Sequence, residues 1–152
     1  VTRRTNFGLR AMFSFVQGFD DTPVPSFERF YMGGENQIRG YDIRTIGPTA
    51  VDDQGRAFLV GGTRMMLFNV EYYIPLAGPL RAVLFFDAGQ AFADVDPIRL
   101  SMFNQLVTST GAEMRFFVPV LNVPFRLIFA YNPNPPPLQP STAFRFGVGS
   151  TF

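Results

Sequence analysis

Apolar and polar positions alternate with a period of two along six segments of the chain, which is typical of β-strands with one apolar face. The clearest segment is 7–17, whose apolar face carries Phe7, Leu9, Ala11, Phe13 and Phe15. The other segments are 64–74, 80–90, 106–118, 125–131 and 144–152. The pattern predicts an all-β chain, in which antiparallel strands follow one another up and down.

The predicted strands are long, and this favours a membrane protein over a soluble one. Most cover about 9–12 residues, whereas strands of soluble proteins average roughly 5–6 and membrane-crossing strands need about 9–11. Their second face carries Arg, Glu and Asn, as the interior of a transmembrane β-barrel does. A soluble lipid-binding barrel or sandwich shows the same alternation, so periodicity alone leaves that alternative open. Strand length and the 19 Phe favour the membrane.

The connections between the strands alternate between short and long. Residues 75–79 and 119–124 form short turns, while the long connections are 18–61, 91–105 and 132–143. Outer-membrane barrels have short periplasmic turns and longer outer loops. The segment 18–61 is far longer than the roughly 12–15 residues beyond which loops tend to be functional or disordered. We therefore expect a functional role for this loop.

The composition excludes several classes of function. The 152 residues contain no His and no Cys, which removes the Ser–His–Asp triad and thiolate metal sites. A net charge of +1 argues against a nucleic-acid surface. The acidic pairs Asp52–Asp53 and Asp94–Asp96 lack the full oxygen set that Ca²⁺ requires. We therefore predict no metal site and no nucleic-acid partner.

Six strands are too few to close a lipid-facing barrel, since known barrels start at about eight. An open sheet in lipid would leave unpaired strand edges, which cost several kcal/mol per unsatisfied group. We therefore expect residues 1–152 to be the C-terminal part of a barrel domain, with further strands before Val1. An isolated fragment would have to hide these edges by self-association into a dimer, by curling up or by binding detergent.

The loop 18–61 and the strands after it carry a set of short motifs in a fixed order. These are Phe30-Tyr31-Met32-Gly33-Gly34, Ile38-Arg39-Gly40-Tyr41, Asp87-Ala88-Gly89 and the aromatic-ended segment 144–152. The set resembles the BamA-type outer-membrane insertase superfamily, also called the surface antigen or POTRA-barrel family, over about residues 7–152. The hallmark of that family is a Val/Ile-Arg-Gly-Phe/Tyr tetrapeptide in a long loop.

The resemblance implies the last six strands of a sixteen-stranded barrel, with POTRA repeats and ten strands upstream. It also implies that the long loop enters the lumen and that Arg39 contacts Glu71 and Asp87. The residues are compatible with this, because both acids lie on the polar face and would need a partner where solvation is poor. An Arg fork can bind two carboxylates, and Gly40 permits a tight turn. Without the resemblance, the tetrapeptide is more typical of a surface turn and the acids of ordinary lumen carboxylates.

The last segment carries the remaining candidate residues, which are Phe144, Phe146, Gly147, Gly149 and Phe152. In the family the last strand pairs weakly with the first, and that seam opens laterally. Glycine within a strand weakens pairing, which fits a seam; the alternative is that the two glycines are small lumen residues that leave room for the loop. Phe152 is expected at the membrane interface and resembles the signal that insertases recognise.

The resemblance implies an assembly factor that folds and inserts β-barrel proteins into the bacterial outer membrane, within a BAM complex. Its partners would be outer-membrane lipid, nascent β-barrel clients and accessory lipoproteins. The mechanism would be strand augmentation at an open edge in a thinned bilayer. The resemblance thus implies a protein that is not an enzyme and needs no cofactor. The alternatives are a two-partner secretion pore and, from another class, the soluble lipid-binding barrel or sandwich.

Overall fold

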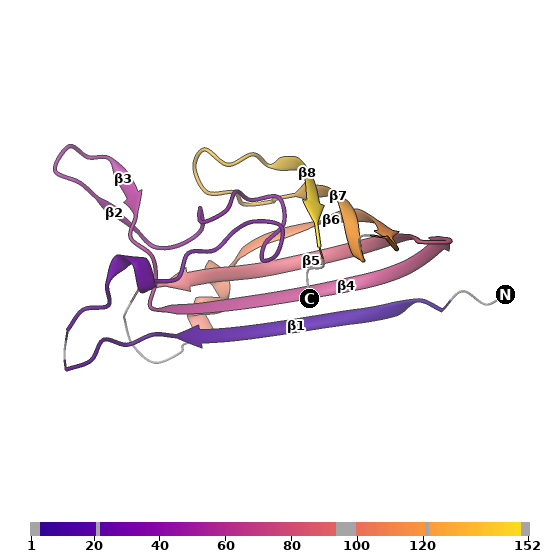
Figure 1. Cartoon of the computed structure of the whole chain (residues 1–152). Helices are drawn as coiled ribbons and strands as arrows, with labels where there is room; N and C mark the ends of the chain where they lie inside the picture. The colour runs from indigo at the N-terminus through magenta and orange to yellow at the C-terminus, as the bar shows by residue number, and fades with distance from the viewer. Residues whose placement is uncertain (1–3, 21, 94–99, 121, 150–152) are drawn as a thin grey trace.

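The computed structural model describes residues 4–20, 22–93, 100–120 and 122–149. Its main element is one antiparallel sheet with the strand order β1-β4-β5-β6-β7-β8. The strands are β1 (Asn6–Phe15), β4 (Arg64–Ala77), β5 (Leu80–Phe92), β6 (Val107–Val118), β7 (Val123–Tyr131) and β8 (Thr142–Val148). The predicted all-β fold is confirmed, and every strand pairs with its neighbour along the sheet (Figure 1).

The strand boundaries depart from the predicted segments most clearly in β4, β5 and β8. β4 and β5 are longer than predicted, with 14 and 13 residues. The last strand is shorter than the predicted segment 144–152, because it ends at Val148 and Gly149 has a φ of 106°. That φ is incompatible with extended backbone and favours glycine. Phe152 lies outside the described residues.

The long loop contains a small hairpin that the sequence pattern did not indicate. It consists of β2 (Thr49–Val51) and β3 (Ala57–Leu59). Asp52 closes the turn, since its carboxylate accepts hydrogen bonds from the backbone N–H groups of Gln54 and Arg56. These bonds and the Arg56 side chain lower the pKa of Asp52. The Asp52–Asp53 pair is thus part of an ordinary turn.

The helices of the described residues are two short 3₁₀ segments, η1 (Ser26–Glu28) and η2 (Leu100–Gln105). Within this part of the chain, no helix has the length and apolar character needed to cross a bilayer.

The two faces of the sheet have opposite chemistry. We call the face with Phe7, Leu9, Phe86, Phe129 and Phe144 the outer face, and these side chains are exposed. We call the other the inner face, and it buries charged and polar groups including Glu71, Asp87, Glu113 and Arg126. Exposed aromatic and buried charged residues are the reverse of a soluble domain and typical of a membrane barrel.

The loop after β1 lies on the inner face, in the hollow of the curved sheet (Figure 1). An apolar cluster joins Met32, Ile38, Tyr41 and Ile46 of the loop to Met65, Leu67 and Ala91 of the sheet. Backbone bridges between Phe30 and Gly62 and between Met32 and Ile46 fix its path. The principal core of the chain is therefore the contact between this loop and the inner face.

Candidate functional site

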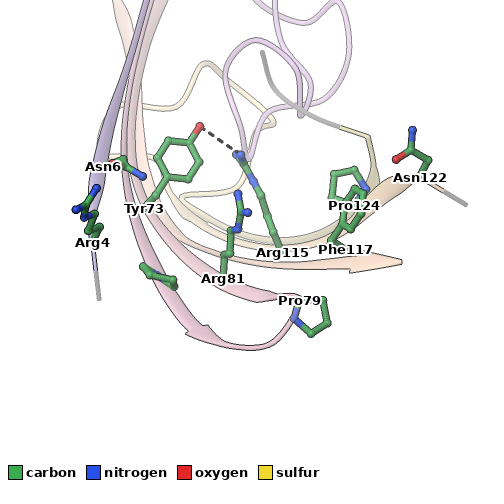
Figure 2. Close-up of a pocket in the computed structure, with 10 residues that line it drawn as sticks. Arg4, Asn6, Tyr73, Pro79, Arg81, Arg115, Phe117, Asn122 and Pro124 are labelled. Atoms are coloured by element: carbon green, nitrogen blue, oxygen red, sulfur yellow. Dashed lines mark hydrogen bonds between the residues drawn. The ribbon is translucent and has the colours of Figure 1, made fainter. Parts of the chain in front are cut away.

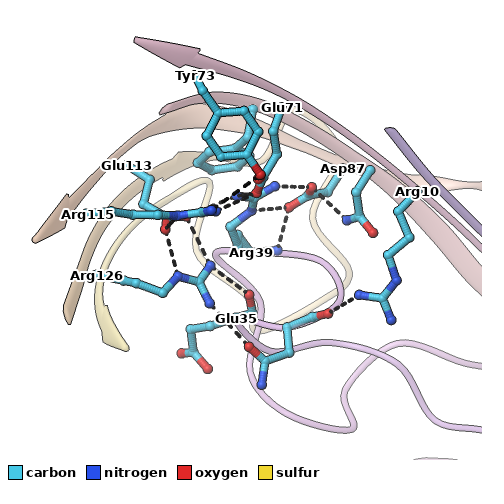
Figure 3. Close-up of polar contacts among 12 residues, drawn as sticks. Arg10, Glu35, Arg39, Glu71, Tyr73, Asp87, Glu113, Arg115 and Arg126 are labelled. Carbon is cyan, nitrogen blue, oxygen red and sulfur yellow. Dashed lines mark hydrogen bonds and ion pairs between the residues drawn. The ribbon is translucent and has the colours of Figure 1, made fainter. Parts of the chain in front are cut away.

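Arg39, at the tip of the inward loop, is held by three carboxylates (Figure 3). Its Nη1 lies 2.5 Å from Glu71 Oε1 and 3.0 Å from Glu113 Oε2. Its Nη2 and Nε bind the two oxygens of Asp87 at 2.6 and 2.7 Å, and the Arg39 backbone N–H also donates to Asp87 Oδ2. All four side chains are 0% exposed. The loop tip is therefore anchored by charge-assisted bonds, which are the stronger class of hydrogen bond.

Burial by itself lowers the pKa of Arg39, but the hydrogen bond and charge of Asp87 and the charges of Glu71 and Glu113 outweigh it. The net effect raises the pKa above its ordinary value. Arg39 is therefore a permanent cation at the centre of the site.

The inner-face register explains why these acids converge. Glu71 lies on β4, and Asp87 lies on β5 directly opposite Asn69, two residues before Glu71. Glu113 lies on β6 opposite Val83 of β5. The structure thus brings Arg39, Glu71 and Asp87 together and adds a third carboxylate, Glu113, which was not among the site residues predicted from the sequence.

Two further arginines of the inner face, Arg115 and Arg126, bind Glu113 and balance the negative charge of the cluster. Arg115 binds Glu71 through Nη2 at 2.7 Å and Glu113 through Nε at 2.5 Å. Arg126 binds Glu113 through Nε at 2.7 Å, and its Nη2 donates to the backbone carbonyl of Glu35 in the loop. The cluster therefore holds three carboxylates and three guanidinium groups. This balance matters because an unpaired buried charge is very costly.

Uncharged groups complete the anchor. The Arg39 guanidinium carbon lies 3.9 Å from the centroid of the Phe85 ring, a cation–π contact. Asn69 Nδ2 donates to the Gln37 carbonyl of the loop at 2.7 Å and to Asp87 Oδ1 at 2.8 Å. The Tyr73 hydroxyl donates to Glu71. The sheet thus binds loop backbone as well as the Arg39 side chain.

Gly40 and Ile38 seat the tip against the sheet. Gly40 has a φ of 89°, and a Cβ there would lie 2.6 Å from Ala130 Cβ and 2.8 Å from Asn132 Oδ1. Asn132 Nδ2 in turn donates to the Gly40 carbonyl. Ile38 is fully buried in the apolar cluster. The tip fits only because Gly40 has no side chain.

Tyr41 completes the predicted tetrapeptide. Its hydroxyl donates to the Thr108 carbonyl of β6 at 3.0 Å, and its side chain is buried. Burial raises the pKa of Tyr41 to about 12.

We predict that Tyr41 makes folding stability fall at high pH. Its folded pKa lies above the ordinary value of 10, so the folded state favours the neutral hydroxyl. The resulting stabilisation is complete below pH 10 and is lost as the pH rises toward 12. Denaturant unfolding at several pH values should show a steeper decline for the unaltered protein than for Tyr41→Phe. Parallel declines in the two proteins would contradict the prediction.

The C-terminal strand places its candidates on both faces. Phe144 and Phe146 lie on the outer face, where their rings pack against Phe129 and Phe125. Gly147 lies on the inner face opposite Arg126, and a Cβ there would lie 3.9 Å from Glu35 of the loop.

Arg145 of the same strand links β8 to the loop, and it was missed in the sequence. Its Nη2 binds Asp42 Oδ1 at 2.5 Å. Asp42 follows the tetrapeptide directly and Arg145 lies on the polar face of β8, but neither pattern indicates that the two residues pair. The loop tip therefore contacts β8 as well as the central strands.

A cavity of about 780 Å³ opens on the inner face at the end of the sheet with the short turns (Figure 2). Arg81 and Arg115 line it from directly opposite positions on β5 and β6, and Arg4 lines it from the chain before β1. The Arg115 side chain is occupied by Glu71 and Glu113, whereas Arg81 is exposed. The opening of this cavity therefore carries positive charge and can accommodate water and anions.

The chemistry of the site is that of an anchor. Each carboxylate of the cluster is bound by at least one guanidinium group, so its charge is used to hold the loop. No group of three or more possible metal ligands occurs within the described ranges. The arrangement fixes a loop rigidly across strands β4 to β8.

Comparison with known proteins gives consistent matches. A family model described as the Omp85 superfamily domain matches residues 1–152. The outer membrane protein assembly factor BamA of Nitratidesulfovibrio vulgaris is 36% identical over 132 residues, which cover 85% of this chain and 16% of that protein. The chloroplastic outer envelope protein 80 of Arabidopsis thaliana is 28% identical over 159 residues, which cover 98% of this chain and 19% of that protein.

A solved structure has the same fold. The chain aligns with a crystal structure of BamA from Haemophilus ducreyi that lacks POTRA domains 1–3, with a TM-score of 0.73 and 17% identity. The match covers 95% of this chain and 30% of that one. The six-stranded sheet therefore has the fold of part of a BamA barrel. The chain spans less than a fifth of the length of the two relatives named above.

Proposed function

The chain belongs to the Omp85 superfamily, and from this premise we propose that it is the C-terminal barrel part of a bacterial factor that folds and inserts outer-membrane proteins. Proteins of this family form β-barrels in an outer membrane, and the BamA branch consists of assembly factors that are not enzymes. The predictions of an outer-membrane barrel and of a non-enzymatic protein are thereby confirmed. Matches to a chloroplast protein as well as to bacterial BamA make the bacterial location part of the proposal.

The match along the whole chain is the observation that carries this proposal. We propose that residues 1–152 supply the last six strands of a larger barrel, with further strands and periplasmic repeats before them. The 16% share of the bacterial relative leaves ample length for both. The partners would be outer-membrane lipid, nascent β-barrel clients and accessory lipoproteins.

The geometry supports a role in strand pairing. β1 and β8 are the two edges of the sheet, and the hydrogen-bonding groups of a free edge are a template for another strand. The loop links the edge strands to the centre, because Arg10 of β1 donates to the Asn36 carbonyl and Arg145 of β8 binds Asp42. We propose that the anchored loop keeps the edges in place while one of them serves as a template.

We also propose that β8 forms the opening seam of the barrel. Gly147 removes side-chain packing from this edge strand, which supports weak pairing, and Gly149 ends the strand. Phe144 and Phe146 would hold the strand in the lipid, with Phe152 at the interface.

We expect the complete protein to restore the growth of a bacterium depleted of its own assembly factor. The rescue should be accompanied by recovery of folded outer-membrane porins, measured by heat-modifiable mobility on gels. A variant in which the residues of β8 stand in reversed order provides a control for expression alone.

A different result would favour the two-partner secretion alternative. Failure to rescue, combined with large stable single-channel conductance and export of a partner protein encoded beside it, would overturn the assembly proposal. Monomeric folding without detergent would favour the soluble barrel or sandwich.

A further inference from the structure

The 3₁₀ segment η2, in the connection between β5 and β6, packs against the outer face of the sheet. Met102 is buried there in an apolar cluster with Met66 of β4 and Phe92 of β5. The Phe103 ring lies 6.1 Å from that of Phe68, centroid to centroid. Met66, Phe68 and Phe92 belong to the outer face by their register with Phe13, Ala11 and Arg64. A non-strand segment thus covers part of the surface that elsewhere carries exposed Phe.

A groove of about 360 Å³ lies between η2 and the strands. Phe68, Phe86 and Ala88 line it from β4 and β5, and Phe103, Leu106 and Thr108 line it from η2 and the start of β6. Ala88 forms the bottom of the groove, and its small side chain leaves the space above it open. Phe103 remains 44% exposed and Phe86 46% exposed. The groove is therefore apolar and open to whatever surrounds the barrel.

The groove lies where the outer face changes from apolar to polar. On β5 the outer-facing residues from Leu80 to Ala88 are apolar, and the next one is Gln90. That apolar run measures about 27 Å along the strand at roughly 3.4 Å per residue, close to the roughly 25 Å apolar band of outer-membrane barrels. On β4 the outer face ends in Arg64, beyond Met66. The groove therefore lies at the membrane boundary on the side of the long loops.

We propose that this groove binds an acyl chain of a lipid in the loop-side leaflet, with η2 as its wall at the level of the headgroups. The groove adjoins the apolar outer-facing run of β5 at Phe86 and Ala88, and this continuity with the lipid-facing band favours lipid over a protein partner. Irregular backbone exposed to lipid does not occur within the hydrocarbon region, so η2 must lie at the interface. The inference rests on the membrane location of the family and is independent of the assembly function.

Tryptophan quenching tests the position of η2, because the 152 residues contain no Trp. Phe103→Trp would be introduced into the complete protein, with any tryptophan elsewhere replaced by Phe, and reconstituted in phosphatidylcholine vesicles. The vesicles would contain phospholipids brominated at different depths of the acyl chain. We expect bromines near the lipid carbonyls to quench the fluorescence of the Trp at position 103 at least twofold more than bromines near the chain ends. Leu84→Trp in the band should show the reverse depth preference, and Phe58→Trp in the β3 hairpin should be unquenched. A Phe103→Trp signal as unquenched as that of Phe58→Trp would overturn the proposal.

Filling the groove tests acyl-chain binding itself. Ala88→Leu raises the floor, and Ala82→Leu makes the same change on the same face of β5, away from η2. We expect Ala88→Leu to lower the quenching of Phe103→Trp by at least half, and Ala82→Leu to leave it unchanged. Native mass spectrometry of both proteins should show retained phospholipid lost only with Ala88→Leu. Equal quenching and equal lipid retention in the two variants would overturn the proposal.

Discussion

Arg39→Ala is expected to release the long loop from the inner face and to abolish function while the sheet stays folded. The substitution leaves Glu71, Asp87 and Glu113 buried with only Arg115 and Arg126 as cations. Breaking a buried ion pair by removing one partner costs about 3–5 kcal/mol. The loop escapes that cost by leaving the hollow, because solvent then reaches the carboxylates. The strand pairing has no contribution from Arg39, so the sheet should survive.

Limited proteolysis with chymotrypsin measures this release, since Tyr41 is buried in the docked loop and becomes accessible when the loop leaves. We expect Arg39→Ala to be cut at least tenfold faster after Tyr41, as identified by mass spectrometry of the fragments, because Phe19, Phe27 and Phe58 are exposed even in the docked loop. We also expect this variant to be unable to restore growth of the depleted strain. Arg39→Lys should increase loop cleavage and reduce rescue of growth almost as much as Arg39→Ala, because an ammonium group cannot reproduce the guanidinium fork that binds Asp87. Arg56→Ala is the matched control, since Arg56 lies in the same loop with an exposed side chain. Ordinary loop protection in Arg39→Ala would contradict the anchor.

Gly40→Ala is expected to displace the loop tip although it changes no charge. The new Cβ would meet Ala130 and Asn132 at distances no real Cβ adopts, and the φ of 89° adds strain. The positive φ alone costs about 1–2 kcal/mol, and the steric conflict adds to that. We expect faster chymotrypsin cleavage of the loop and a lower unfolding midpoint in denaturant.

Gly55→Ala separates strain from steric conflict. Gly55 lies in the turn of the β2–β3 hairpin with a φ of 77°, but a Cβ there meets nothing within 4 Å. It therefore carries the conformational cost alone and should leave loop protection unchanged. Equal effects of the two substitutions would show that the close fit of Gly40 against β7 contributes nothing.

The sequence predicted the sheet well because the alternation that identifies a strand lies within that strand's own residues. Side chains alternate between faces along a strand, so Phe7 to Phe15 and the polar positions of β4 define their faces without knowledge of any partner. The predicted end of β8 was wrong, because the sequence alternation continues through Gly149 although the backbone of Gly149 has a positive φ. The β2–β3 hairpin was missed, because three-residue strands are too short to show a period.

The candidate site was only partly accessible for a related reason. The tetrapeptide with Glu71 and Asp87 could be named from the resemblance. Glu113, Arg115 and Arg126 lie on the same inner face, and nothing local distinguishes residues that bind the loop from others that line a wet interior. Asp42 and Arg145 are 103 residues apart in sequence, so their pairing has no local signal.

The sequence by itself determined which residues face outward and which inward, that the chain has no side chains for His- or Cys-dependent chemistry, and that one long loop carries an Arg-Gly motif. Only the tertiary structure decided that Arg39 meets three carboxylates and that Gly40 fits against β7. It also decided that η2 folds over the outer face. The physical reason is that alternation follows from the geometry of a single strand. Contacts between charges depend on the register of several strands and on a loop packed across all of them.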